Sequence, residues 1–229
     1  MIIGMIVAIA DEIHAMLDEC GEPEWDKDDC GIKIRKYSLD AAELYVAHSG
    51  AGQVYAAAAT QLLISKYGAE LIVNFGICGG LTPDMALCRT CVVKSVVHYD
   101  FDTSAVDGCE AGRHLEYPSV YIPADERLVG LALKTDGSMS AVICASGDTF
   151  IDKPEQKHAL AQMYGAKICE MEAAGILLTA NRCGVPALLV KADSDSMGGG
   201  AQEFKRMASE SARACIQVVL RLINAVSNK

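Results

Sequence analysis

The chain lacks any apolar stretch as long as the roughly eighteen residues that span a bilayer, although 51% of its 229 residues are hydrophobic. No basic segment precedes the first apolar run, which is unlike a secretory signal. The 10 cysteines show no paired spacing apart from Cys88 and Cys91, and a chain of this size needs no disulfide framework. We therefore expect a soluble cytoplasmic protein that does not associate with a membrane.

The sequence also lacks the features of nucleic-acid and metal binding. Its formal charge of -10 disfavours a nucleic-acid partner, because phosphate backbones are bound by cationic side chains. Cys88 and Cys91 have no second cysteine pair or nearby histidine to complete a zinc site, so no metal is expected. A small neutral or zwitterionic ligand remains compatible with this charge, because local groups decide recognition at that scale.

Repeats, low-complexity tracts and linkers are absent too, and the length fits one large α/β domain over residues 1–229. Apolar runs rich in Val and Ile predict strands at 2–9, 43–48, 71–75, 91–97, 141–145, 166–170 and 186–192. Helical patterns cover 54–67, 124–134, 154–164, 171–183 and 201–226, the last with an expected break near its start. This alternation predicts a three-layer αβα sandwich around a central mixed, mostly parallel sheet, with a long loop at 98–123.

Three of the predicted strands run into carboxylates at the same relative place. Glu12 follows the first strand, Glu172 the sixth and Asp195 the seventh. Ligands of open α/β sheets bind in the crevice beyond the carboxyl ends of the strands. The three acids therefore indicate acid/base chemistry, although each is also compatible with an ordinary helix-start acid or an Asx turn.

Two glycine-rich segments, 49–52 and 76–80, each stand between a predicted strand and a helix. Glycines there allow a ligand close to the backbone, and amides at a helix start hold oxygen atoms. Neither segment matches a dinucleotide or Walker pattern, so a tight turn is an equal reading.

Six segments, taken together, resemble 5′-methylthioadenosine/S-adenosylhomocysteine nucleosidases of the nucleoside phosphorylase superfamily. The likeness spans almost the whole chain. Its motifs are AIADE at 8–12, SGAG at 49–52, NFGICGG at 74–80, SGDTFI at 146–151, EME at 170–172 and SD at 194–195.

The resemblance implies a role for each acid. Glu12 activates a water, and Asp195 protonates adenine at N7 with Ser194 helping to place it. Met171 and Glu172 hold the ribose, and Glu172 binds the ribose hydroxyl groups. Such a division suits a reaction that builds positive charge on the sugar and negative charge on the departing base.

The same resemblance implies the lining of the purine site. Phe150 stacks on the base and Ile151 reads its edge through the backbone, while Ile77, Cys78 and Gly79 line the same cleft.

The 5′ group of the substrate is expected in an apolar pocket formed by Ile9, Ala51 and Phe204. Part of the 98–123 loop of a second subunit completes this pocket in the family, which implies a homodimer. Ala51 is smaller than the usual aliphatic residue, so we expect a roomier pocket. No cofactor is required.

Two residues depart from the family pattern. Lys191, counted among the substrate-binding residues, stands where an arginine is usual and keeps the charge without the planar fork. Asp193 replaces a common aliphatic residue. It either raises the pKa of Asp195 as a like charge or pairs with Lys191.

The implied reaction is inverting hydrolysis of the N-glycosidic bond of 5′-thioadenosines, giving adenine and a 5-thioribose. A purine nucleoside phosphorylase is the main alternative, but it needs an arginine where Asn74 stands, and Glu12 would repel phosphate. A futalosine or aminofutalosine hydrolase differs mainly in the 5′ substituent. A catalytically silent nucleoside-binding protein is the alternative outside enzymes, and retention of all three acids argues against it.

Overall fold

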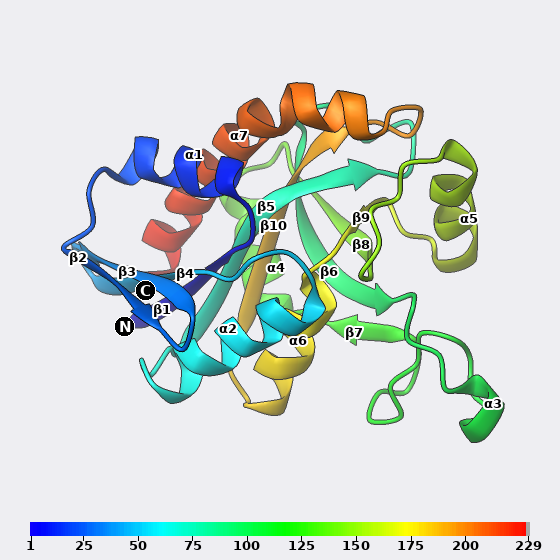
Figure 1. Ribbon diagram of the computed structural model, residues 1–229, viewed down its shortest axis with the longest axis horizontal. Helices are drawn as coiled ribbons and strands as arrows, with labels where there is room; N and C mark the ends of the chain where they lie inside the picture. The colour runs from blue at the N-terminus through cyan, green and yellow to red at the C-terminus, as the bar shows by residue number, and fades with distance from the viewer. Residues whose placement is uncertain (228–229) are drawn as a thin grey trace.

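Two parallel strands, β1 (Ile2–Val7) and β5 (Leu71–Gly80), lie side by side in a mixed sheet in the computed structural model, which describes residues 1–227 (Figure 1). The other strands are β2 (Trp25–Asp29), β3 (Ile32–Leu39), β4 (Ala42–His48), β6 (Thr90–His98), β7 (Tyr121–Pro123), β8 (Ser140–Ser146), β9 (Ile168–Glu170) and β10 (Ala187–Asp195). Their order is β10, β6, β8, β9, β5, β1, β4, β3, β2, with β7 against β6. β10 also pairs with β5, which closes β10, β6, β8, β9 and β5 into a ring.

This closure brings three strand ends together at one glycine. Gly79 of β5 pairs with Cys169 of β9 on one side and with Asp195 of β10 on the other. β10 carries an irregularity between Asp193 and Asp195 at this point. Side chains from all three strands can therefore meet around Gly79.

Helices cover both faces of the sheet (Figure 1). They are α1 (Ala10–Cys20), α2 (Gln53–Ser65), α3 (Ser104–Asp107), α4 (Glu126–Thr135), α5 (Pro154–Tyr164), α6 (Ala173–Arg182) and α7 (Ala201–Ser227). α7 packs with α1 and α4 on one face, α2 packs with α6 on the other, and α5 lies against β8. Among residues 1–227, no helix has both the length and the apolarity to cross a membrane.

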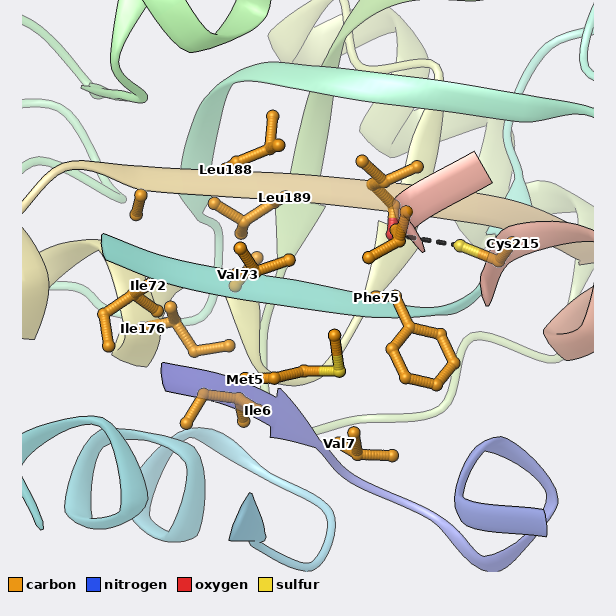
Figure 2. Packing of buried hydrophobic residues seen from close by; sticks show 14 of the residues in the cluster. Met5, Ile6, Val7, Ile72, Val73, Phe75, Ile176, Leu188, Leu189 and Cys215 are labelled. Carbon is orange, nitrogen blue, oxygen red and sulfur yellow. Dashed lines mark hydrogen bonds between the residues drawn. The ribbon is translucent and has the colours of Figure 1, made fainter. Parts of the chain in front are cut away.

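The central strands are apolar because both of their faces are covered. Met5, Val73 and Leu189 come from neighbouring strands and pack together in the core, and none of them is exposed (Figure 2). Cys215 of α7 donates from Sγ to the carbonyl oxygen of Val190 at 3.3 Å, which joins this helix to β10 (Figure 2). Strands covered on both faces lose the alternation of polar and apolar residues, as the sequence indicated.

The α/β class with its mixed sheet is confirmed, and α5 has the predicted bounds. Several boundaries were wrong. Residues 76–80 continue β5 rather than leading to a helix, Asp193 to Asp195 belong to β10, and α7 runs unbroken from Ala201. The expectation of a single domain over 1–229 stays a prediction, and residues 228 and 229 lie outside the described part.

The hairpin of β2 and β3 was not predicted, nor were α1, α3 and β7. β2 has the sequence WDKDD, and its exposed edge position removes the apolar pattern on which the prediction depended. In the turn of this hairpin, Cys30 and Gly31 both have positive φ angles, of 53° and 79°. Two such residues form the tight turn that joins twisted antiparallel strands.

Candidate active site

Glu12 lies at the start of α1 with its carboxylate turned back toward the chain. Oε2 accepts hydrogen bonds from the N–H groups of Ala8 and Ile9 at 3.0 and 3.1 Å, and Oε1 accepts one from Ile77 of β5 at 2.9 Å. A glutamate at the third helical position commonly reaches back in this way. Gly76 makes room for it, because a Cβ atom there would lie 2.6 Å from Oε1.

The side chain of Glu12 is shielded from bulk water, with 4% of the residue exposed. Burial raises the pKa of its carboxyl above the usual range, while the charge of Lys191 and the three N–H groups act in the opposite direction. A fixed carboxylate with a raised pKa suits a general base near neutral pH.

Asp195 ends β10 and places its carboxyl group against Gly79. Oδ1 lies 3.0 Å from Ser194 Oγ, which is also 3.1 Å from the carbonyl oxygen of Cys78. Oδ2 accepts a hydrogen bond from Lys157 Nζ of α5 at 2.5 Å. Burial raises the pKa of Asp195, and Lys157 and Ser194 oppose that rise.

Glu172 stands directly before α6, where its Oε1 accepts a hydrogen bond from the N–H of Gly52 at 2.9 Å. This contact joins the SGAG segment to the EME segment. Burial, followed by the negative charge of Glu170, raises the pKa of Glu172 to about 7, against a lowering by Lys191. Its other oxygen remains available for a ligand hydroxyl.

Glu170 has a contact that the sequence did not reveal. Its Oε2 accepts from Lys191 Nζ at 2.9 Å and from the N–H groups of Glu172 and Ala173 at 3.0 and 2.9 Å. Burial acts to raise the pKa of Glu170, but the Lys191 charge and these hydrogen bonds hold it below the usual value. The expected pair between Asp193 and Lys191 was therefore wrong, because Glu170 takes the lysine.

Asp193 is fully buried on β10, two residues before Asp195. Its Oδ1 accepts a hydrogen bond from Cys78 Sγ at 3.2 Å, and its Oδ2 has no partner among residues 1–227. Burial raises its pKa to about 7, with a further rise from the charge of Asp195 and a lowering by the Cys78 contact.

Two aromatic side chains lie together at the site. The rings of Phe150 and Phe204 meet edge to face, with their centroids 5.4 Å apart. Phe150 keeps 41% of its surface exposed, which is unusual for a phenylalanine and leaves its ring available for stacking.

One cavity brings most of the predicted site residues together. Those that line it are Ile9, Glu12, Ala51, Ile77, Cys78, Gly79, Phe150, Met171, Glu172, Ser194, Asp195 and Phe204. Ile151 lines an adjoining hollow that shares Gly79, Phe150 and Asp195. Lys191 is buried behind Glu170 and does not line either space, which corrects its expected place among the substrate-binding residues.

Sequence reasoning missed Ala8, Cys169 and Glu170 in the lining, and Lys157 beside Asp195. Ala8 and Glu170 lie within recognised motifs, and Cys169 directly precedes one. Lys157 carries no such signal, because it lies in a polar helix where a lysine is expected to face water. Among residues 1–227, no cluster of three or more His, Cys, Asp or Glu side chains is arranged to hold a metal ion.

Comparisons with known proteins identify the family of the chain. The family model of the phosphorylase superfamily matches residues 2–224. A 5′-methylthioadenosine/S-adenosylhomocysteine nucleosidase of Shewanella halifaxensis is 31% identical over 202 residues, with 86% of each chain covered. A nucleosidase of the same name from Desulfotalea psychrophila is 30% identical, with 97% of each chain covered. The chain belongs to this family of nucleosidases.

Solved structures show the same fold. The Helicobacter pylori nucleosidase with butyl-thio-DADMe-Immucillin-A superposes with a TM-score of 0.92 at 25% identity, covering 98% of both chains. Futalosine hydrolase of H. pylori strain 26695 gives a TM-score of 0.92 at 25% identity, covering 98% of this chain and 97% of that one. Family membership confirms the resemblance and the enzyme class, an N-glycosyl hydrolase.

Proposed function

We propose that this enzyme hydrolyses the N-glycosidic bond of 5′-methylthioadenosine and S-adenosylhomocysteine, releasing adenine and the corresponding 5-thioribose. The observation that carries the proposal is the presence of two buried carboxyl groups, Glu12 and Asp195, in one cavity. Their contacts on β5, at Ile77 and Gly79, are two residues apart, or roughly 7 Å along a strand. That spacing leaves room for a ligand between base and acid.

We assign to Glu12 the activation of the nucleophilic water. Its oxygens are fixed by three backbone N–H groups, and its raised pKa makes it a better proton acceptor than an exposed glutamate. A water held by Glu12 attacks the ribose on the face opposite the purine, so the reaction inverts the anomeric carbon.

We assign to Asp195 the protonation of the leaving group. Bond breaking builds negative charge on the purine, and a proton delivered to N7 stabilises that charge. Ser194 keeps the carboxyl oriented through Oδ1. Phe150 and Ile151 hold the base, supported by their position beside Asp195 and Gly79.

We assign to Glu172 the binding of the ribose hydroxyl groups, and Met171 packs against the sugar. A carboxylate oxygen accepts hydrogen bonds from hydroxyl groups, and Gly52 occupies only one oxygen of Glu172. Ile9, Ala51 and Phe204 surround the 5′ group. All proton transfers use side chains and water, and no cofactor is required.

Water is favoured over phosphate as the nucleophile. Asn74, at the position where a phosphorylase needs an arginine, donates from Nδ2 to the carbonyl oxygen of Ile6 at 3.0 Å and carries no charge. The Glu12 carboxylate would repel a phosphate in the same cavity. Futalosine hydrolysis is the second candidate, supported by the structural likeness to the H. pylori futalosine hydrolase.

We also propose that the enzyme forms a homodimer and that it is located in the cytoplasm. Val54 and Tyr55, next to the cavity-lining Ala51, are 75% and 62% exposed, and Leu115 of the 98–123 segment is also 62% exposed. Apolar side chains this exposed at a site opening support a protein contact there. The free state of the cysteines supports a reducing compartment. Sedimentation of Tyr55→Glu beside the unchanged protein tests the dimer, which is rejected if both sediment as monomers.

Product analysis tests the reaction. Methylthioadenosine, S-adenosylhomocysteine, futalosine and adenosine are each incubated with the enzyme in buffers with and without phosphate. We expect adenine and free thioribose from the first two in the absence of phosphate. Release that requires phosphate would establish a phosphorylase, and preference for futalosine would establish the second candidate.

A further inference from the structure

Lys157 of α5 is a fully buried lysine whose ammonium group lies against the end of β10. Nζ is 2.5 Å from Asp195 Oδ2, 2.7 Å from the carbonyl oxygen of Ser196 and 3.4 Å from that of Asp195. An ammonium group has three N–H donors, and each has an acceptor here. The lysine thus belongs to the site, although it does not line the cavity.

Asp195 is the direct ionic partner of Lys157 among the acids around it. Glu203 of α7 accepts from the N–H and Oγ of Ser196 at 2.6 and 2.8 Å. The pKa of Asp193 is raised to about 7 by burial, and burial raises that of Cys169 on β9 to about 12. The charge of Lys157 also acts to lower the pKa values of Asp193, Cys169 and Glu203, but its ion pair is with Asp195.

This pairing conflicts with a simple acid role for Asp195. A cation in contact with a carboxyl group favours its ionised form, so Lys157 opposes the rise that burial gives to the pKa of Asp195. A general acid must hold a proton to deliver it. The contact becomes productive when the lysine provides that proton.

We propose that Lys157 supplies the proton that Asp195 passes to the purine. The proposal rests on the proposed hydrolysis of an adenine nucleoside. As the C1′–N9 bond breaks, its electron pair moves into the purine ring. The Asp195 carboxylate accepts a proton from Lys157 Nζ at Oδ2 and gives one to N7, so that Asp195 is a carboxylate again at the end of the step. Lys157 ends as a neutral amine and recovers a proton from solvent after adenine leaves.

The surroundings accommodate both protonation states. Before transfer, the ammonium donates to Oδ2 and to the two carbonyl oxygens. After transfer, the neutral amine keeps two N–H donors for the same three acceptors, and Ser194 still donates to Asp195 Oδ1. Neither state leaves an N–H group of the lysine without an acceptor, which keeps the transfer reversible.

Substrates with two different leaving groups distinguish a role of Lys157 in supplying the proton from a purely structural role. Adenine requires a proton to leave, whereas p-nitrophenolate leaves without one. Lys157→Met and Lys157→Arg are compared on methylthioadenosine and on p-nitrophenyl 5-methylthio-β-D-riboside. Arginine keeps the positive charge but does not give up a proton. Lys153→Met, an exposed lysine just before the same helix, is the control.

Both Lys157 variants should lower kcat for adenine release by about 10²-fold or more, and change nitrophenol release by no more than about threefold. Lys153→Met should change neither. An equal loss on both substrates would show a structural role and overturn the relay. Full adenine release by Lys157→Arg would overturn it as well, because charge alone would then suffice. If the unchanged enzyme releases no adenine, the proposed function itself fails.

The unchanged enzyme provides a second measurement that does not depend on a variant. Single-turnover rates are followed in mixtures of H₂O and D₂O with the two substrates. The relay predicts that two more protons move during the reaction of methylthioadenosine than during that of the nitrophenyl riboside. The difference is measured as additional curvature in the plot of rate against the deuterium fraction of the solvent. One additional proton would mean that Asp195 supplies its own, and the proposal would be rejected.

Discussion

Lys191 Nζ lies 2.9 Å from Glu170 Oε2, and this buried pair fixes the start of α6. The same carboxylate accepts the N–H groups of Glu172 and Ala173. The ion pair of Glu170, two residues before Glu172, therefore holds Glu172 in place, and both glutamates line the cavity. The lysine acts on the ribose site through Glu170.

Lys191→Met should destabilise the fold by about 3 to 5 kcal/mol, because it leaves Glu170 buried without its counter-charge. It should also raise KM through displacement of Glu172. Urea denaturation gives the free energy of unfolding. Lys167→Met breaks the exposed pair with Asp84 and, as the control, should change stability by no more than about 1 kcal/mol.

The double variant Glu170→Gln with Lys191→Met refines this prediction. It removes both charges, so it should be more stable than Lys191→Met alone. If the single and double variants unfold at the same urea concentration, the ion pair is not what holds α6.

Glu12→Gln should lower kcat by about 10² to 10⁴-fold, because an amide does not accept the proton of the attacking water. Its NH₂ group would also face a backbone N–H now bonded to the carboxylate, with a loss of about 1 to 3 kcal/mol in stability. Near-normal turnover by a folded Glu12→Gln protein would show that Glu12 is not the general base. Circular dichroism provides the folding control.

The pH dependence of kcat/KM tests the same residue in the unchanged enzyme. Glu12 must be ionised to act as a base, and burial raises its pKa. Activity should therefore fall as the pH is lowered through a value above that of an ordinary glutamate. An acid limb at the usual glutamate pKa would contradict the assignment.

The parts of the fold that local patterns dictate were predictable from the sequence. α5 begins with Pro154 and ends before Gly165, and both boundaries follow from backbone preferences of those residues. The apolar central strands were predictable for a similar reason. By contrast, Gly76 to Gly80 were placed between a strand and a helix, with a tight turn as one of two equal readings, although they complete β5. The glycines are there because Glu12 and Asp195 approach the strand, a cause that is distant in sequence.

The candidate site shows the same limit. Glu12, Glu172 and Asp195 were found because strand ends of an α/β sheet converge. Lys157 was not, because its burial depends on α5 docking against the end of β10, 38 residues away along the chain. Likewise, the partner of Lys191 depends on how β9 and β10 lie across the ring of strands, which no local pattern specifies.

Ala51 should allow larger 5′ substituents than the aliphatic residue usual in the family. It lines the cavity with Ile9 and Phe204, in the segment between β4 and α2. Ala51→Leu should lower kcat/KM for butylthio- and homocysteinyl-adenosine by about tenfold relative to methylthioadenosine, because a larger side chain fills the space. Equal changes on all three substrates would show that Ala51 does not face the 5′ group.

Asp193 is a carboxyl group in a place where charge is unfavourable. It is fully buried, its Oδ2 has no partner among residues 1–227, and its pKa is raised to about 7, first by burial. Its raised pKa means that the folded state binds this proton more tightly than the unfolded state. The resulting destabilisation is absent below about pH 4, grows as the pH rises to about 7, and then stays constant.

Asp193→Asn should therefore be more stable than the unchanged protein at pH 8, by up to about 4 kcal/mol, with the difference vanishing near pH 4. Asparagine keeps an acceptor for Cys78 Sγ and cannot ionise. Urea denaturation of both proteins across this pH range measures the difference, and a gap independent of pH would show that Asp193 does not titrate there. The basic limb of kcat/KM in Asp193→Asn tests whether Asp193 also tunes Asp195, which must hold a proton to act as an acid. An unmoved limb would mean that burial and the contact with Lys157 set the protonation of Asp195 without Asp193.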